Sequence, residues 1–219
     1  GYASRFYGLL TTMQTGWDFL KVIRPHSDKS GGAMRAPVLG LLPDIDQVIQ
    51  AARFQASLTH CTQVGMDAAV VAAVMTHYCY YRIGPRDMLP EYLGEIFLCF
   101  RLDNPWHGLV GDPGNQHVHA AMTALIENDS MVDILRACVA FTGDVDTVAA
   151  IAAPAASFCD DIDQTLPAAL VDGLENGPYG RDYLDGLDDR LLAKFPRPVD
   201  PPEEKTDGGE DPIMDLFGN

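Results

Sequence analysis

The stretch VGMDAAVVAAVMTHYCYYRI, residues 64–83, has small and apolar residues on most sides of a helix, and Gly84-Pro85 follows it. A helix that is apolar all round is buried on all sides. Proline cannot continue a helix, so this one should end before Pro85. We therefore expect a central helix over residues 64–83, with the rest of the chain packed around it.

Helical spacing of apolar residues and the signals that start and stop helices predict further helices on both sides of this stretch. No segment alternates like a strand, and no internal repeat is present. The predicted fold is an all-α, multi-helix globular bundle. Its other expected helices span residues 3–23 (as one helix or two), 44–60, 88–102, 116–127, 131–141 with Ser130 as its cap, a helix from Asp144 that Pro154 should kink, 165–175 and 179–195.

The composition separates a helical domain at residues 1–195 from an acidic tail at residues 196–219. The chain has 219 residues, is 47% hydrophobic and carries a net charge of −16, which argues against nucleic acid as a partner. The tail is rich in Pro and Gly and holds seven acidic residues against two basic ones, so we expect it to be disordered. Its apolar end, Ile213–Phe217, could dock on a partner protein.

The five cysteines have no C-x-x-C spacing and are odd in number, which indicates reduced thiols in a cytoplasmic protein. They are Cys61, Cys79, Cys99, Cys138 and Cys159. No signal peptide is present, and no apolar run is long enough to span a bilayer, so no membrane partner is expected.

The stretch Phe141–Thr147 (FTGDVDT) places two carboxylates and a hydroxyl at the start of a small, apolar helix. Asp144 could cap that helix by accepting hydrogen bonds from its first amides. Asp144 and Thr147 are three residues apart and face the same way, whereas Asp146 points elsewhere unless a ligand draws it in. A hard cation such as magnesium would do so. A capped helix with a surface Asp is the alternative.

Two further segments could bind a ligand. In residues 26–35, amides around Gly31-Gly32 could form an anion-binding concavity, to which Lys29 and Arg35 would add charge; the alternative is a flexible connector or a helix cap. His60, at the end of a helix, could bond a ligand or act as a base, or could be satisfied by neighbouring backbone.

Two other clusters of polar residues are not expected to form a functional site. The acidic doublets Asp160-Asp161 and Asp188-Asp189 are expected on solvated faces. The pair His117 and His119 is not a zinc site, because positions two apart on a helix do not share a face.

The order of Ser30–Pro37 (SGGAMRAP), Leu58–His60 (LTH) and Gly143–Ala152 (GDVDTVAAIA) resembles the ADP-ribosylglycohydrolase family, which includes the dinitrogenase reductase-activating glycohydrolases. Leu166–Leu170 and Leu174–Arg181 are similar to the closing helices of that family, so the resemblance covers roughly residues 1–195. It implies an all-α bundle with two Mg²⁺ ions, or sometimes Mn²⁺, in a central cleft.

The resemblance also implies a reaction and its site. The reaction is hydrolysis of the N- or O-glycosidic bond that joins ADP-ribose to a protein side chain or a small molecule. By resemblance, Asp144, Asp146 and Thr147 would be metal ligands, and His60 would lie near the ligand. No catalytic residue is assigned. The implied diphosphate-binding residues are Ser27, Asp28, Lys29, Ser30, Gly31 and Gly32.

The sequence departs from the family in one respect that bears on function. The family's Thr-Asp-Asp block, which supplies the other metal ligands, is absent, and Ser30 stands where many members have Asn. Because the chain opens Gly1-Tyr2, we expect that a segment carrying the block precedes it. A non-catalytic relative that binds ADP-ribose or is purely structural, and an interaction protein acting through the acidic tail, are the alternative functions.

Overall fold

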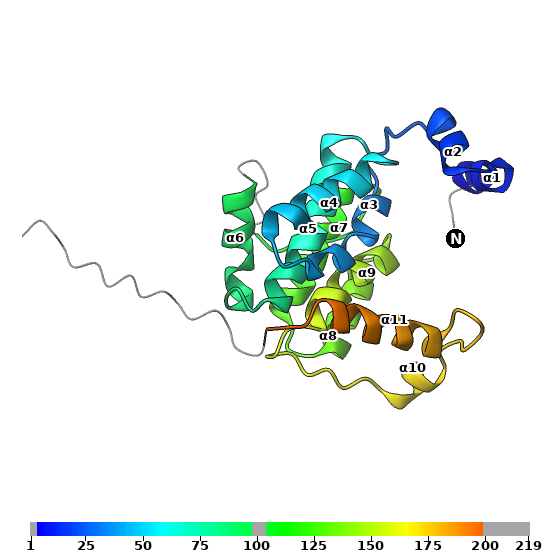
Figure 1. The fold of residues 1–219 in the computed structure, drawn as a ribbon. Helices are drawn as coiled ribbons and strands as arrows, with labels where there is room; N and C mark the ends of the chain where they lie inside the picture. The colour runs from blue at the N-terminus through cyan, green and yellow to red at the C-terminus, as the bar shows by residue number, and fades with distance from the viewer. Residues whose placement is uncertain (1–3, 98–103, 199–219) are drawn as a thin grey trace, which may run out of the picture.

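The computed structural model describes residues 4–97 and 104–198, and within them the fold is all-α, as predicted (Figure 1). The only β pairing in these residues is four isolated bridges. The helices are α1 (Ser4–Thr12), α2 (Gly16–Val22), α3 (Gly31–Met34), η1 (Pro37–Leu41, a 3₁₀ helix), α4 (Ile45–Ser57), α5 (Gln63–Tyr80), η2 (Arg86–Met88, also 3₁₀), α6 (Leu89–Ile96), α7 (Gly114–Glu127), α8 (Met131–Ala140), α9 (Val145–Ala156), α10 (Ala168–Asp172) and α11 (Arg181–Lys194).

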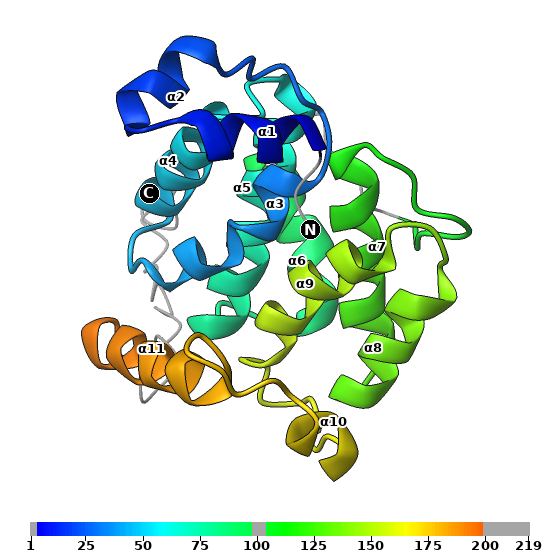
Figure 2. The same cartoon turned by 90° about the vertical axis from the view of Figure 1, so that its right-hand side faces the viewer.

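Helix α5 is the centre of the bundle, as its apolar sequence predicted. Every residue from 68 to 80 is buried. Helices α3, α4, α7 and α9 and the 3₁₀ helix η1 pack around it (Figure 2). Thr62 caps its start, accepting a hydrogen bond from the Gly65 amide at 3.1 Å. It ends at Tyr80, earlier than predicted, because Arg82 adopts a positive φ of 51°.

Helix η1 lies unusually close to α5. A Cβ at Gly40 would be only 2.5 Å from the carbonyl oxygen of Ala73, so no larger residue fits there without displacement. His77 of α5 donates a hydrogen bond from Nδ1 to the Gly40 carbonyl at 3.0 Å, which satisfies this buried ring. The loop from α3 to α4 is thereby fixed against the central helix.

Helices α7, α8 and α9 form the other side of the bundle. The predicted cap of α8 is confirmed, because the Asp133 amide donates to Ser130 Oγ at 3.1 Å. Helix α9 continues as one element to Ala156, so Pro154 lies in its last turn and does not divide it. Pro154 has no N–H to donate within the helix, and only two residues of α9 follow it.

Helices α1 and α2 stand apart from the bundle (Figure 1). The predicted segment is two short helices, and Thr15 and Asp18 form a capping box at the start of the second. The rings of Phe6 and Phe19 pack edge to face at 5.9 Å and hold the pair together. None of their described side chains is buried.

Helices in the last part of the chain are shorter than predicted, and α10 and α11 have no buried residues. The helix predicted over 88–102 ends at Ile96, because Phe97 adopts an extended backbone, and residues 98–102 lie outside the described residues. The acidic tail from residue 199, with its apolar cluster Ile213–Phe217, also lies outside them. Arg197, which we expected in the tail, donates from Nε to the Tyr80 carbonyl at 3.1 Å. Within the described ranges, no helix combines the length and hydrophobicity needed to cross a membrane.

Candidate active site

A strained turn sets the direction of the first acidic residue of the site. Thr142 and Gly143, just before α9, have positive φ angles of 62° and 84°. Val110 brackets the turn, donating to the Thr142 carbonyl at 3.1 Å and accepting from the Asp144 amide at 3.2 Å. A Cβ at Gly143 would lie 2.1 Å from the Val110 oxygen. Only glycine combines this approach with this backbone conformation.

Asp144 does not cap α9 through its side chain, so that prediction is wrong. Its backbone (φ −85°, ψ 64°) lacks the extended conformation of typical N-caps. The carboxylate turns instead towards α7 and the loop before α3. Its Oδ2 accepts from His117 Nε2 at 2.8 Å and from Ser30 Oγ at 3.5 Å, and its Oδ1 accepts from Thr147 Oγ1 at 3.1 Å.

These contacts keep Asp144 ionised. Burial alone would raise its pKa, but hydrogen bonds with His117, Asp146 and Thr147 outweigh burial and lower the pKa below its ordinary value. Asp146 is exposed, yet its carboxyl interacts with that of Asp144. Thr147 is buried and faces Asp144, as their spacing predicted, and its hydroxyl also contacts Met34 Sδ at 3.5 Å. The two carboxylates and the hydroxyl therefore form one cluster.

His117 belongs to this cluster, and sequence reasoning missed it. The ring is fully buried in the first turn of α7. Its Nδ1 donates to the Pro113 carbonyl at 3.0 Å, and its Nε2 faces Asp144. A carbonyl and a carboxylate on opposite sides of the ring fix its orientation. His119 contacts the Asn104 carbonyl at 2.6 Å, whereas His117 faces Asp144, so the two rings have separate partners, in keeping with positions two apart on a helix.

The segment around Gly31 and Gly32 is a helical turn, α3, instead of the open loop we expected. Ser30 precedes it with a buried hydroxyl directed at Asp144. A Cβ at Gly31 would lie 3.1 Å from the ring of His60, and one at Gly32 would lie 3.4 Å from the Ala56 Cβ. The glycines therefore let the chain approach His60 closely, and they bring residues 26–35 and His60, the two segments predicted to bind a ligand, together.

His60 is held by a chain of hydrogen bonds. Arg35 donates from Nη2 to Thr59 Oγ1 at 2.9 Å, and the Thr59 hydroxyl lies 2.6 Å from His60 Nδ1. The Thr59 hydroxyl accepts from Arg35, and the tautomer of the His60 ring decides whether that hydroxyl donates to Nδ1 or accepts from it. Burial and then the charge of Arg35 lower the pKa of His60 to about 4, so the ring is neutral at pH 7. Its Nε2 lies beside Gly31.

Residues 27–29 anchor the segment through their backbone. The Ser27 carbonyl accepts from Thr62 Oγ1 at 3.0 Å, and the Asp28 carbonyl accepts from the first amide of α7 at 2.8 Å. The ammonium of Lys29 pairs with Asp112 at 2.9 Å, and this exposed contact raises the pKa of Lys29. The charge of Lys29 is therefore directed to Asp112.

The acidic doublets lie outside the site. Asp188 and Asp189 are exposed on α11, as predicted for a solvated face. Asp160 and Asp161 are also exposed, but each pairs with an arginine of the segment after α5, at 2.5 and 3.0 Å. They hold the end of α9 in place.

The site has a donor set of two carboxylates and one hydroxyl for a cation, from Asp144, Asp146 and Thr147. Between residues 4 and 97 and between 104 and 198, no group of three or more His, Cys, Asp or Glu side chains could hold a metal ion. Magnesium, however, often uses one or two carboxylates and completes its shell with water and substrate oxygens. Two carboxylates and one hydroxyl are donors of the kind that one such ion takes, and a second ion would need further carboxylates.

Comparison with known families gives one finding. A family model described as ADP-ribosylglycohydrolase matches residues 5–200. A search of curated proteins returned no match. The matched range contains the Ser30 segment, His60 and the start of α9, which the structure brings together.

Proposed function

Because the chain belongs to the ADP-ribosylglycohydrolase family, we propose that it hydrolyses the glycosidic bond between ADP-ribose and a protein side chain or small molecule, with the help of magnesium. The observation that carries the proposal is the contact between Ser30 Oγ and Asp144 Oδ2 at 3.5 Å, across 114 residues of sequence. It joins the glycine segment to the acidic start of α9, so one ligand can reach both.

The glycine segment and His60 suit the diphosphate of ADP-ribose. Glycine lets phosphate oxygens approach the backbone, and amides of such a turn can donate to them. The neutral His60 ring places its Nε2 beside Gly31 and, in the tautomer with its hydrogen on Nε2, can donate to the same group without adding charge. Arg35 and Thr59 hold the ring in place through Nδ1.

The start of α9 suits the ribose and the bond that is cleaved. Asp144 is ionised and can accept hydrogen bonds from ribose hydroxyls, and Asp146 is exposed at the mouth of the site. Magnesium would be held by Asp144, Asp146 and Thr147, where it would polarise a water molecule or a ribose oxygen. His117 and Ser30 fix the Asp144 carboxylate from two sides, so its orientation is set before a ligand binds.

The test is release of free ADP-ribose from peptides ADP-ribosylated on arginine or on serine, with Mg²⁺ or with EDTA. We expect release from one of them with Mg²⁺, its loss with EDTA, and its loss in Asp144→Asn. Asp188→Asn, on exposed α11, is the matched control and should keep full activity. Absence of release from both peptides under every condition would refute the proposed hydrolysis.

A second candidate is a relative that binds ADP-ribose without cleaving it. It is favoured by the small donor set, and by His117, which already occupies one oxygen of Asp144. Calorimetric titration with ADP-ribose separates the two. Binding that is equal with Mg²⁺ and EDTA, together with no turnover, would support the non-catalytic relative.

A further inference from the structure

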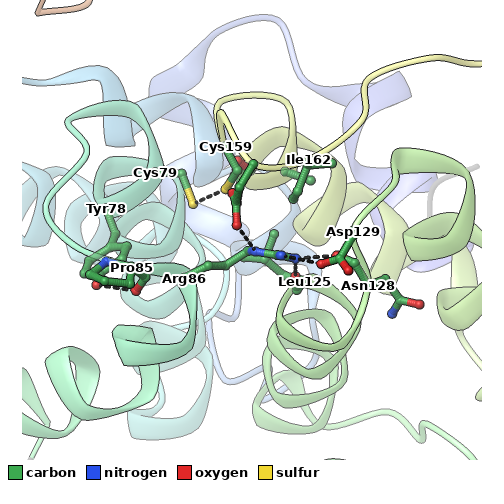
Figure 3. A network of polar contacts seen from close by, with 12 residues as sticks. Tyr78, Cys79, Pro85, Arg86, Leu125, Asn128, Asp129, Cys159 and Ile162 are labelled. Carbon is green, nitrogen blue, oxygen red and sulfur yellow. Dashed lines mark hydrogen bonds and ion pairs between the residues drawn. The ribbon is translucent and has the colours of Figure 1, made fainter.

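Two cysteines meet at the end of the bundle that lies away from the active site. Cys79 is near the end of α5, and Cys159 follows the end of α9. Both are buried, and their Sγ atoms are 2.9 Å apart (Figure 3). Along α5, Cys79 is about 21 Å from Gly65, which lies beside His60. The sulfur pair therefore belongs to a separate part of the molecule.

We propose that Cys79 and Cys159 are an oxidisable pair that forms a disulfide between α5 and the end of α9. A disulfide has an S–S distance of about 2.05 Å, so the two sulfurs need to approach by only about 0.9 Å. Of the four cysteines in the described residues, all have free thiols, Cys61 is exposed and Cys138 is buried. The one sulfur–sulfur contact recorded for these residues joins Cys79 to Cys159.

Neighbouring contacts fix the backbone on both sides of the pair. Arg197 donates to the carbonyl of Tyr80, next to Cys79, at 3.1 Å, and to the carbonyl of Phe158, next to Cys159, at 2.5 Å. The rings of Tyr80 and Phe158 also pack edge to face at 4.8 Å. The Arg197 guanidinium and this ring pair thus hold the backbones of the two cysteines beside each other.

Arg86, below the two cysteines in Figure 3, makes a second set of contacts that link the same elements. It donates from Nε to Asp161 at 3.0 Å, from Nη2 to Asp129 at 2.7 Å, and from Nη1 to the carbonyls of Leu125 and Asn128. It therefore links the end of α7 to the turn that carries Cys159. Closing the disulfide would not require this frame to move far.

The two cysteines lie beside a cavity. Both cysteines line a cavity of about 670 Å³, with Arg82, Arg86 and Asp160 at its sides. Oxidised glutathione is a suitable oxidant class: the two protein S–H bonds break, one protein S–S bond forms, and glutathione disulfide is reduced to two glutathione thiols. The hydrogen bond from Cys159 and burial raise the pKa of Cys79, which lowers its thiolate fraction and slows the exchange at neutral pH.

The disulfide should stabilise the fold and leave the active site unchanged. It would close a loop of 80 residues, which constrains the unfolded chain. We expect the midpoint of thermal unfolding to rise by about 5–15 °C. Because the sulfurs already touch in the thiol form, ADP-ribose affinity should stay the same within twofold.

The experiment equilibrates the full chain with glutathione disulfide, alkylates the remaining thiols and maps the peptides by mass spectrometry. We expect a Cys79–Cys159 peptide pair, loss of two hydrogens from that pair, and the rise in midpoint. Cys138→Ala is the matched control and should keep both results, whereas Cys79→Ala and Cys159→Ala should each lose the rise. Alkylation of both cysteines after equilibration, pairing with any other cysteine, or an unchanged midpoint would each overturn the proposal.

Discussion

Replacing Gly143 with alanine should destabilise the protein, because this glycine carries the turn that aims Asp144. Its φ of 84° is in the left-handed region, which costs a residue with a Cβ about 1–2 kcal/mol. The new Cβ would lie 2.1 Å from the Val110 oxygen, well inside contact distance, so Val110 must move.

Movement of Val110 weakens the two hydrogen bonds that bracket the turn, each worth about 1 kcal/mol. Together with the backbone strain, we expect the free energy of unfolding to fall by about 3–4 kcal/mol. Urea denaturation followed by circular dichroism measures this quantity directly. Since Asp144 follows the turn, affinity for ADP-ribose should fall as well.

Gly94→Ala in α6 is the matched control. A Cβ there meets no atom within 4 Å, and alanine favours a helix over glycine, so this variant should gain about 0.5–1 kcal/mol. A loss below about 1 kcal/mol in Gly143→Ala would show that the turn tolerates a side chain. It would refute the account of how Asp144 is positioned.

Three further changes test other parts of the structure. His60 has a pKa of about 4 in the folded protein and 6.5 in the unfolded chain, so between these values the unfolded state binds more protons and the wild-type protein loses stability as the pH drops from 6.5 to 4. His60→Asn should remove about 2–3 kcal/mol of that loss, measured by urea denaturation at each pH. An unchanged dependence of stability on pH would contradict the assignment. Thr147→Val keeps the shape of the side chain but loses the hydrogen bond to Asp144, so calorimetry should show weaker Mg²⁺ binding, and Thr147→Ser should keep the wild-type affinity. Equal Mg²⁺ affinities in Thr147→Val and the wild type would remove Thr147 from the donor set. Arg86→Leu leaves the carbonyls of Leu125 and Asn128 without their donor and should lower the free energy of unfolding by about 3 kcal/mol in thermal melts. A loss under about 1 kcal/mol would mean that water replaces the guanidinium as donor.

The helical architecture could be predicted because local signals decide it. The apolar stretch of α5, the Ser130 cap and the proline and glycine stops each depend on near neighbours in sequence. The ends of helices were harder, since a positive φ at Arg82 ends α5 early and no simple residue pattern announces it. Tertiary contacts set such boundaries.

The contacts within the candidate site could be predicted only in part. The spacing of Asp144 and Thr147 correctly placed them on one side. The side chain of Asp144 was expected on its own helix, but the long-range partners His117 and Ser30 draw it away. His117 was overlooked because the pair with His119 was judged as a unit, although burial of a single histidine in the first turn of α7 was the relevant signal.

The central claim is that the glycine segment, His60 and the start of α9 form one site for ADP-ribose. The most direct measurement follows backbone amide chemical shifts by NMR during titration with ADP-ribose and Mg²⁺. We predict that the signals of Gly31, His60 and Thr147 shift together with a single dissociation constant. Shifts confined to other parts of the chain, or no shifts at saturating ADP-ribose, would contradict the claim.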